Sequence, residues 1–264
     1  MRKKNEANLV RDPVTNAVIT MDYSSLEEKG NRDQMVDLLR RCPIPDHSIL
    51  SNLGLYFNSK TLSRIIFLHE FYKMGLGVMG QVFDFGTRWG QNMAIFIACR
   101  GMYEPFNRHR KIVGFDTFGG FPSTEAKDGD SQMIGVGNIP VTDAYELYLE
   151  RLMSTLERNN ALPHLKKYEL VKGDASHTVE KYFRDNPHAI VSHAFFDFDL
   201  YKPTHDCLKM IFERAPKGAV IGFDELNDED SPGETIALQE VLGLGNIRLQ
   251  RFPWVSRVSF FVKE

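Results

Sequence analysis

The chain has 264 residues, of which 42% are hydrophobic and 25% are charged, and its formal net charge is −3. This is the composition of an ordinary globular protein, and the length allows one large domain or one domain with an appendage. A chain without a basic surplus is not expected to bind nucleic acid. No apolar run approaches the roughly 20 residues that a membrane span needs, so we expect no membrane partner.

The three cysteines are widely spaced and form no C-x-x-C pair. An odd number of separated cysteines predicts neither a disulfide framework nor a zinc site, and it favours a reducing compartment. The first residues, MRKKNEANLVRD, are charged and lack the apolar run of a signal peptide. We therefore expect a soluble, cytoplasmic protein.

Residues 1–60 are mostly polar, with short apolar patches, and are interpreted as an N-terminal helical extension that packs on the main body. The stretch DQMVDLLRR predicts a short helix, which PIPDHS ends. We expect this extension to act as a lid over a bound acceptor. A homo-oligomer in which the extension contacts a second subunit is also open.

Residues 61–264 alternate between helical and strand patterns and are predicted to form the main domain. Strands are expected at QVFDFG, KIVGFDTF, YELVKGD, AIVSHAFFDFD and GAVIGFDE, each followed by an amphipathic stretch. This alternation predicts a doubly wound, mostly parallel α/β sheet of about seven strands. The last two strands, IRLQRF and RVSFFVKE, have no helix between them and predict an antiparallel C-terminal hairpin. Ligands bind such sheets at the carboxyl ends of the strands.

The first of these strands ends in FDFGTRWGQN, where Asp84 is followed by Gly86, Thr87 and Gly90 before a helix. Glycines let the backbone turn sharply and approach a ligand, and a helix amino end can face a polar or anionic group. An ordinary strand-to-helix turn is the alternative, because the full G-x-G-x-x-G fingerprint of dinucleotide-binding proteins is missing. The missing fingerprint also argues against a nicotinamide-dependent dehydrogenase.

The second and third strands also end in aspartates. Asp116, followed by Thr117, stands where an acidic side chain can accept hydrogen bonds from both hydroxyls of a ribose. A solvated strand-end aspartate is the alternative. Asp174, followed by Ala175, either caps the helix that starts near Ser176 or faces an adenine, and the pattern leaves both roles open.

The fourth and fifth strands end in AFFDFDLY and VIGFDELNDED, so adjacent strands end in Asp197 and in the pair Asp224 and Glu225. Carboxylates that converge on one point repel each other unless a divalent cation lies between them, and oxygen ligands suit Mg²⁺, Mn²⁺ or Ca²⁺ better than zinc. A solvated loop is the alternative for Asp224 and Glu225. Asp199 faces the same side as Asp197 and is expected to shape the turn into LYKPT.

These motifs together resemble the macrocin O-methyltransferase family of sugar methyltransferases, which use S-adenosylmethionine and Mg²⁺. Relatives have D-S-F-x-G-L-P after the second strand and D-x-D-L-Y-x-S/P-T after the fourth, where this chain has DTFGGFP and DFDLYKPT. The similarity covers roughly residues 75–264. The chain departs from the family at DFGTRWGQ, where relatives commonly have E-x-G-V-W-R-G-G, and at the acidic pair, which is usually two aspartates.

The resemblance implies an S-adenosylmethionine-dependent O-methyltransferase that acts on a hydroxyl of a sugar or glycosylated small molecule, assisted by Mg²⁺ or Mn²⁺. The implied metal ligands are Asp197, Asp224 and Glu225, and Asp197 is also implied as the catalytic base. The implied cofactor contacts are Asp84, Gly86, Thr87, Gly90, Asp116, Thr117, Asp174 and Ala175. A non-catalytic protein of the same fold and a methyltransferase for catechol-like acceptors are the alternatives.

Overall fold

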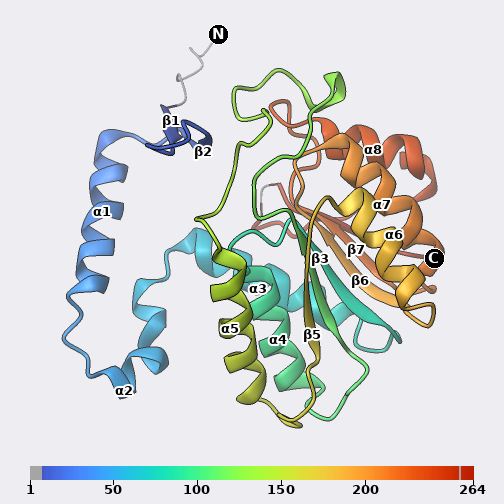
Figure 1. The fold of residues 1–264 in the computed structure, drawn as a ribbon, viewed down its shortest axis with the longest axis horizontal. Helices are drawn as coiled ribbons and strands as arrows, with labels where there is room; N and C mark the ends of the chain where they lie inside the picture. Colours follow the sequence, from blue (N-terminus) through green and yellow to red (C-terminus); the bar gives the residue numbers. More distant parts are fainter. Residues whose placement is uncertain (1–7, 256) are drawn as a thin grey trace.

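A six-stranded sheet forms the centre of the computed structural model, which describes residues 8–255 and 257–264 (Figure 1). The strand order is β5-β4-β3-β6-β7-β8. All neighbouring pairs are parallel except β7 and β8, which are antiparallel. The strands are β3 (Gln81–Phe85), β4 (Ile112–Asp116), β5 (Tyr168–Lys172), β6 (Val191–Phe196), β7 (Val220–Phe223) and β8 (Ser259–Val262).

The predicted doubly wound α/β sheet with an antiparallel C-terminal pair is therefore confirmed, but the sheet has six strands and not seven. The segment IRLQRF, expected as a strand, forms a single antiparallel bridge between Gln250 and Phe260. Most of its side chains are exposed or half-buried, so little apolar burial holds it against the sheet edge. Strand β8 pairs along its length with β7 instead.

Helices cover both faces of the sheet (Figure 1). On one face, α3 (Ser59–Met74), α4 (Gln91–Tyr103) and α5 (Tyr145–Arg158) bury apolar side chains such as Phe71, Phe96 and Met153. The other face is covered by α6 (Ala175–Asp185), α7 (Tyr201–Arg214) and α8 (Gly233–Val241). Two short 3₁₀ turns, η2 (Ala126–Asp128) and η3 (Leu244–Asn246), lie in the connections.

Strand β3 shows why the sequence forms a central parallel strand. All five of its residues are buried, as expected for a strand covered on both faces. Phe83 and Phe85 belong to the core beneath α6 and α7, whereas Val82 belongs to the core beneath α3 and α4. The chain winds outward from β3 in one direction and from β6 in the other, so a crevice for ligands is expected at their carboxyl ends.

The N-terminal extension is only partly helical. It begins with an antiparallel hairpin of β1 (Asn8–Arg11) and β2 (Val18–Asp22), which the sequence analysis did not predict. Helix α1 (Leu26–Arg40), the short α2 (Asp46–Ile49) and η1 (Leu50–Tyr56) follow. Helix α1 contains most of the predicted helix DQMVDLLRR but starts earlier, because Ser25 and Glu28 form a capping box at its N-terminus.

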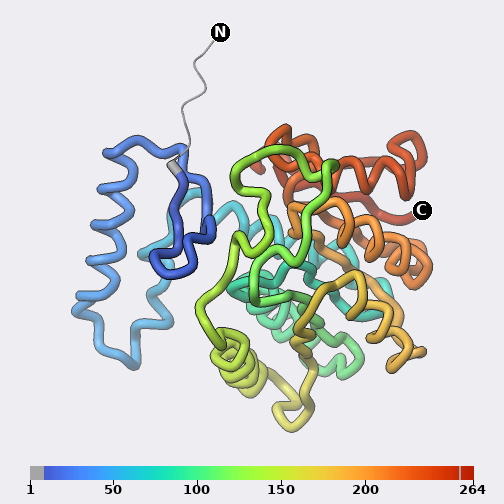
Figure 2. Tube along the Cα trace, turned by 45° about the horizontal axis from the view of Figure 1, so that its top comes forward, coloured from blue at the N-terminus to red at the C-terminus, as the bar shows by residue number. Residues whose placement is uncertain are grey.

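Helix α1 stands apart from the sheet and its covering helices in both views, and none of its residues is buried (Figures 1 and 2). The hairpin, in contrast, lies against the loop between β4 and α5 (Figure 2). No helix in the part of the chain described here is long and apolar enough to cross a membrane.

Candidate active site

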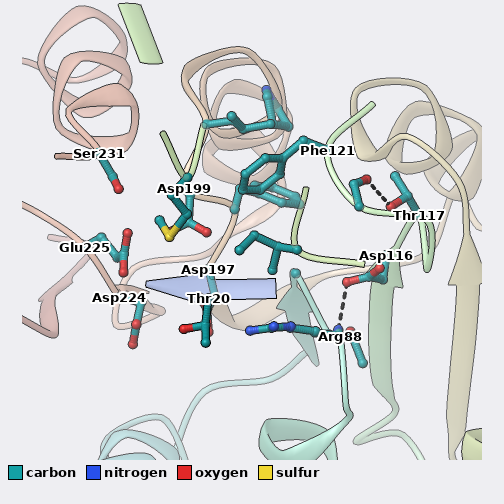
Figure 3. Close-up of a pocket in the computed structure, with 18 of the residues that line it drawn as sticks. Thr20, Arg88, Asp116, Thr117, Phe121, Asp197, Asp199, Asp224, Glu225 and Ser231 are labelled. Carbon is teal, nitrogen blue, oxygen red and sulfur yellow. Dashed lines mark hydrogen bonds between the residues drawn. The ribbon is translucent and has the colours of Figure 1, made fainter. Parts of the chain in front are cut away.

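A pocket of about 520 Å³ opens at the carboxyl ends of the parallel strands, where the sheet predicts a ligand site (Figure 3). This volume is typical of small-molecule sites. Of the predicted site residues, those that line it are Gly86, Thr87, Asp116, Thr117, Asp174, Ala175, Asp197, Asp224 and Glu225. Asp84 and Gly90 do not line it.

The turn after β3 needs glycine at two positions. Gly86 has φ of 76°, and a Cβ atom there would lie 1.9 Å from the backbone oxygen of Asp197. Gly90 has φ of 80°, and a Cβ atom there would lie 2.4 Å from a methyl group of Leu149. The turn can therefore pass close to the end of β6 and lead directly into α4, with Gly86 and Thr87 forming one wall of the pocket.

Asp84 lies behind that wall and is fully buried. Its Oδ1 atom accepts a hydrogen bond from Asn92 Nδ2 at 3.0 Å, and its Oδ2 atom has no hydrogen-bond partner among the described residues. Burial raises the pKa of Asp84 to about 6. Asp84 therefore affects the pocket indirectly, by orienting Asn92, which lines it.

Asp116 is held by two backbone amides at the end of β4. Its Oδ2 atom accepts from the Arg88 N–H at 2.7 Å (Figure 3), and its Oδ1 atom accepts from the Phe118 N–H at 2.5 Å. Each carboxylate oxygen can accept a further hydrogen bond, so both remain able to meet ribose hydroxyls. Thr117 Oγ1 donates to the Gly120 carbonyl at 2.6 Å and fixes the following turn.

Asp174 has the capping role that was one of its two predicted functions. It is the N-cap of α6, and its Oδ1 atom accepts from the Ser176 N–H at 3.0 Å. Asp174 and Ala175 also line the pocket, so contact with an adenine stays a prediction.

The three predicted metal ligands gather at the opposite end of the pocket from Asp116 (Figure 3). Asp197 follows β6, and Asp224 and Glu225 follow the neighbouring strand β7. Burial, and then the charge of Asp224, raises the pKa of Asp197 to about 8. Asp197 and Asp224 are therefore close enough for their charges to affect each other.

Two arginines that the sequence analysis missed contact these carboxylates. Arg64, on α3, donates through Nη2 to Asp197 Oδ2 at 2.7 Å and through Nη1 to Asp224 Oδ1. Arg257 pairs with Glu225 and lies 3.6 Å from Asp224 Oδ2. Nothing in LSRIIFLHEF marks Arg64 as a site residue, because its partners are 133 and 160 residues away.

The carboxylate oxygens of Asp197, Asp224 and Glu225 suit a hard divalent cation. In this structure, however, these side chains form ion pairs with arginines. Glu225 Oε2 is buried and has no hydrogen-bond partner in the described chain, as expected for an oxygen that awaits a ligand. Within residues 8–255 and 257–264, no three histidine, cysteine, aspartate or glutamate side chains are arranged to hold a metal ion. The residue types at the site thus fit a divalent cation, two of whose ligands, Asp197 and Asp224, are the ion-pair partners of Arg64.

Asp199 lies in the turn after β6 and lines the same pocket (Figure 3). Its φ of 61° is unusual for a residue other than glycine, and aspartate tolerates it better than most. The buried Glu234 holds this turn, since its Oε1 atom accepts from the N–H groups of Phe198 at 2.9 Å and Asp199 at 3.3 Å. Glu234 lies in the first turn of α8, and no motif in the sequence singled it out.

The N-terminal hairpin forms a further wall that the sequence analysis did not place. Thr20, Met21 and Tyr23 line the pocket. The hairpin is bonded to the rest of the site through the Ile19 carbonyl, which accepts from Arg88 Nη2 at 2.9 Å, and the Val18 carbonyl, which accepts from the Ile139 N–H at 2.7 Å. Such contacts depend on backbone positions far apart in sequence and leave no motif.

No family model and no curated protein matches the chain. Among solved structures, it is similar to the crystal structure of CalS11, a calicheamicin methyltransferase, with 34% sequence identity, coverage of 90% of this chain and 93% of that one, and a TM-score of 0.88. The chain belongs to the macrocin O-methyltransferase-like family. This O-methyltransferase is therefore an enzyme that depends on S-adenosylmethionine, as its motifs implied.

Two further solved structures are similar, the first in sequence and fold and the second in fold alone. An apo structure of CalS11, described as a TDP-rhamnose 3′-O-methyltransferase of calicheamicin biosynthesis, is 32% identical, with coverage of 90% of this O-methyltransferase and 95% of that chain and a TM-score of 0.80. The O-methyltransferase NovP is 16% identical, with coverage of 76% and 79% and a TM-score of 0.54, and shares the fold.

Proposed function

We propose that this O-methyltransferase transfers the methyl group of S-adenosylmethionine to a hydroxyl of a sugar or glycosylated small molecule, with the help of Mg²⁺ or Mn²⁺. One observation carries the proposal: a single pocket has Asp116 at one end and Asp197, Asp224 and Glu225 at the other (Figure 3). A cofactor and an acceptor can therefore meet between them. Because CalS11 is described as acting on TDP-rhamnose, a nucleotide-linked deoxysugar is the first acceptor to test.

The cofactor would occupy the side of the pocket formed by β3, β4 and β5. Asp116 would accept hydrogen bonds from the ribose hydroxyls, and Gly86 and Thr87 would pass beneath the methionine part. Asp174 and Ala175 would lie near the adenine. Asp84 and Gly90 would act from behind the wall, Asp84 by orienting Asn92 and Gly90 by starting α4.

The acceptor would occupy the side formed by β6 and β7. Asp197, Asp224 and Glu225 would hold the divalent cation, which would lower the pKa of a hydroxyl bound to it. Neighbouring hydroxyls on a sugar suit such a site because both can face the same cation. A catechol has the same pair of oxygens, and its use is the rival outcome.

Asp197 would accept the proton of the reacting hydroxyl. A carboxylate placed at the acceptor side of the pocket can take such a proton as a general base. The deprotonated oxygen would then form a bond to the methyl carbon as the bond from that carbon to sulfur breaks, which releases S-adenosylhomocysteine. Orienting the two substrates in one pocket can supply up to about 7–11 kcal/mol of the barrier reduction.

Residues 1–60 would act as a lid on the catalytic domain of residues 61–264. The hairpin supports this role, because Thr20, Met21 and Tyr23 face the pocket while Val18 bonds the loop that carries Ile139. Closing such a wall would exclude water from the transferring methyl group.

The acceptor class can be tested with labelled S-adenosylmethionine and two acceptors, TDP-rhamnose and a catechol, each at the same concentration. We expect label in the sugar nucleotide and little in the catechol. Labelling of the catechol alone would overturn the sugar assignment while leaving the methyltransferase assignment intact.

A further inference from the structure

Arg64 spans the two strand tips that carry the proposed metal ligands. Its guanidinium contacts one oxygen of Asp197 after β6 and one oxygen of Asp224 after β7, and Nη2 also donates to Asn92 Oδ1 at 3.2 Å. The guanidinium lies over the ring of Phe195, 5.6 Å from its centre. A planar fork of donors matches two carboxylates better than a lysine ammonium would.

The charges at this end of the pocket require a cation. Asp197, Asp224 and Glu225 follow two neighbouring strands and line one pocket, and unpaired carboxylates in a protein interior are costly. Arg64 is the residue that forms an ion pair with Asp197 in the described chain. The guanidinium thus performs in this structure the charge compensation that a divalent cation would otherwise provide.

Arg64 engages one oxygen of each of the two aspartates that a metal would bind. With Asp197 Oδ2 and Asp224 Oδ1 turned toward the guanidinium, the acidic side chains of the described ranges are not arranged to hold an ion. Glu225 Oε2, which Arg64 does not reach, is buried and has no hydrogen-bond partner among residues 8–255 and 257–264. A cation held between Asp197 and Asp224 would take the place of the guanidinium that now bridges them, so we expect Arg64 to leave when the metal binds.

Arg64 is placed so that it can leave. Its side chain is 25% exposed, it lines the pocket, and it lies near the start of α3, so that rotation of its long side chain needs no movement of the helix. Rotation toward the pocket would place the charged group in solvent or beside an anionic part of the acceptor.

We propose that Arg64 and the divalent cation are alternative occupants of the same carboxylates. Arg64 satisfies them in the metal-free protein and sets the affinity for the metal, because binding must first break its ion pairs. Arg64 is thus a positioning residue, because it determines the metal concentration at which the site becomes occupied. This inference rests on the proposed metal site.

Mn²⁺ binding, measured by electron paramagnetic resonance of the free ion, tests the proposal without any assay of activity. We expect Arg64→Gln to bind Mn²⁺ about tenfold more tightly than the wild type, since the competing charge-assisted hydrogen bonds are gone. Arg257→Gln is the matched control: it removes one positive charge from the same carboxylates but leaves the Asp197 oxygen engaged by Arg64. We expect a smaller gain for it.

A second readout is thermal unfolding in chelator and in Mn²⁺. Arg64→Gln should lower the melting temperature in chelator, because it leaves buried carboxylates unpaired, and Mn²⁺ should restore it. Two results would contradict the competition between Arg64 and the metal but leave the metal site intact. One is Mn²⁺ binding by Arg64→Gln that is equal to or weaker than that of the wild type, and the other is an equal gain in affinity from Arg257→Gln. Absence of Mn²⁺ binding in the wild type and both variants would overturn the metal site itself.

Discussion

At the scale of single residues, the carboxylates of the pocket divide into those that face ligands and those that build the site. Asp197 faces the pocket and has a pKa raised to about 8, whereas the buried Glu234 bonds the backbone of the turn that presents it. Asp116 combines both tasks, since two backbone amides orient a carboxylate that still lines the pocket.

Replacing Asp197 by asparagine removes the proposed base and one metal ligand but keeps the shape of the side chain. We expect the rate of methyl transfer to fall about 100-fold or more, which is typical for loss of a general base. The affinity for S-adenosylmethionine, measured by calorimetry, should change little because the proposed cofactor position is on the side of Asp116.

Asp199→Asn is the matched control, since asparagine also tolerates the left-handed backbone at this position. We expect a smaller loss of rate than for Asp197→Asn. A larger loss at Asp199 would assign the proton transfer to that carboxyl group.

Residue types at strand ends allowed much of the site to be predicted, because chain order places the carboxyl ends of parallel strands along one edge. Asp116, Asp197, Asp224 and Glu225 all reach the pocket for this reason. Arg64 could not be predicted in this way. Its helix shows only the apolar periodicity of a core-facing segment. The partners of the Arg64 side chain are distant in sequence, so no local pattern marks the residue.

At the scale of elements, the hairpin of β1 and β2 is the least predictable part of the site. Its strands are short, and the pocket contacts of Thr20 and Tyr23 depend on docking against a distant loop. Strand β3 was predictable for the opposite reason, since its short run of apolar residues and the glycines that follow it are a local signal of a strand and its turn.

Deleting residues 1–22 should remove the hairpin wall while leaving the cofactor side of the pocket in place. We expect the KM for the acceptor to rise several-fold or more, with the dissociation constant for S-adenosylmethionine changed much less. Steady-state kinetics and calorimetry on the truncated protein would check this. Equal losses in the two constants would contradict a lid role for the hairpin.

At the scale of the whole molecule, a buried polar network ties α3 to the sheet on the side away from the pocket. His193 in β6 is fully buried, and its Nε2 atom donates to the Tyr72 carbonyl at 2.9 Å. Burial is the main cause that lowers the pKa of His193 to about 3. The folded protein therefore keeps this imidazole neutral at pH values where an unfolded chain would protonate it.

This predicts how stability depends on pH. Between about pH 6.5 and pH 3 the unfolded state binds one more proton at His193 than the folded state, so the free energy of unfolding falls as the pH falls, by up to about 1.4 kcal/mol per pH unit from this group. Urea unfolding at several pH values should show a flatter decline for His193→Gln than for the wild type. The exposed His177, changed in the same way, should leave the slope unaltered.

The dependence of methyl transfer on a divalent metal is the most direct test of the proposed metal site. The wild-type enzyme, S-adenosylmethionine and TDP-rhamnose would be assayed after treatment with a chelator, and again after Mg²⁺ or Mn²⁺ is added in excess. We predict that the chelator abolishes methylation of the sugar nucleotide and that either metal restores it. Full methylation of the sugar in the presence of chelator would contradict the proposed use of Asp197, Asp224 and Glu225.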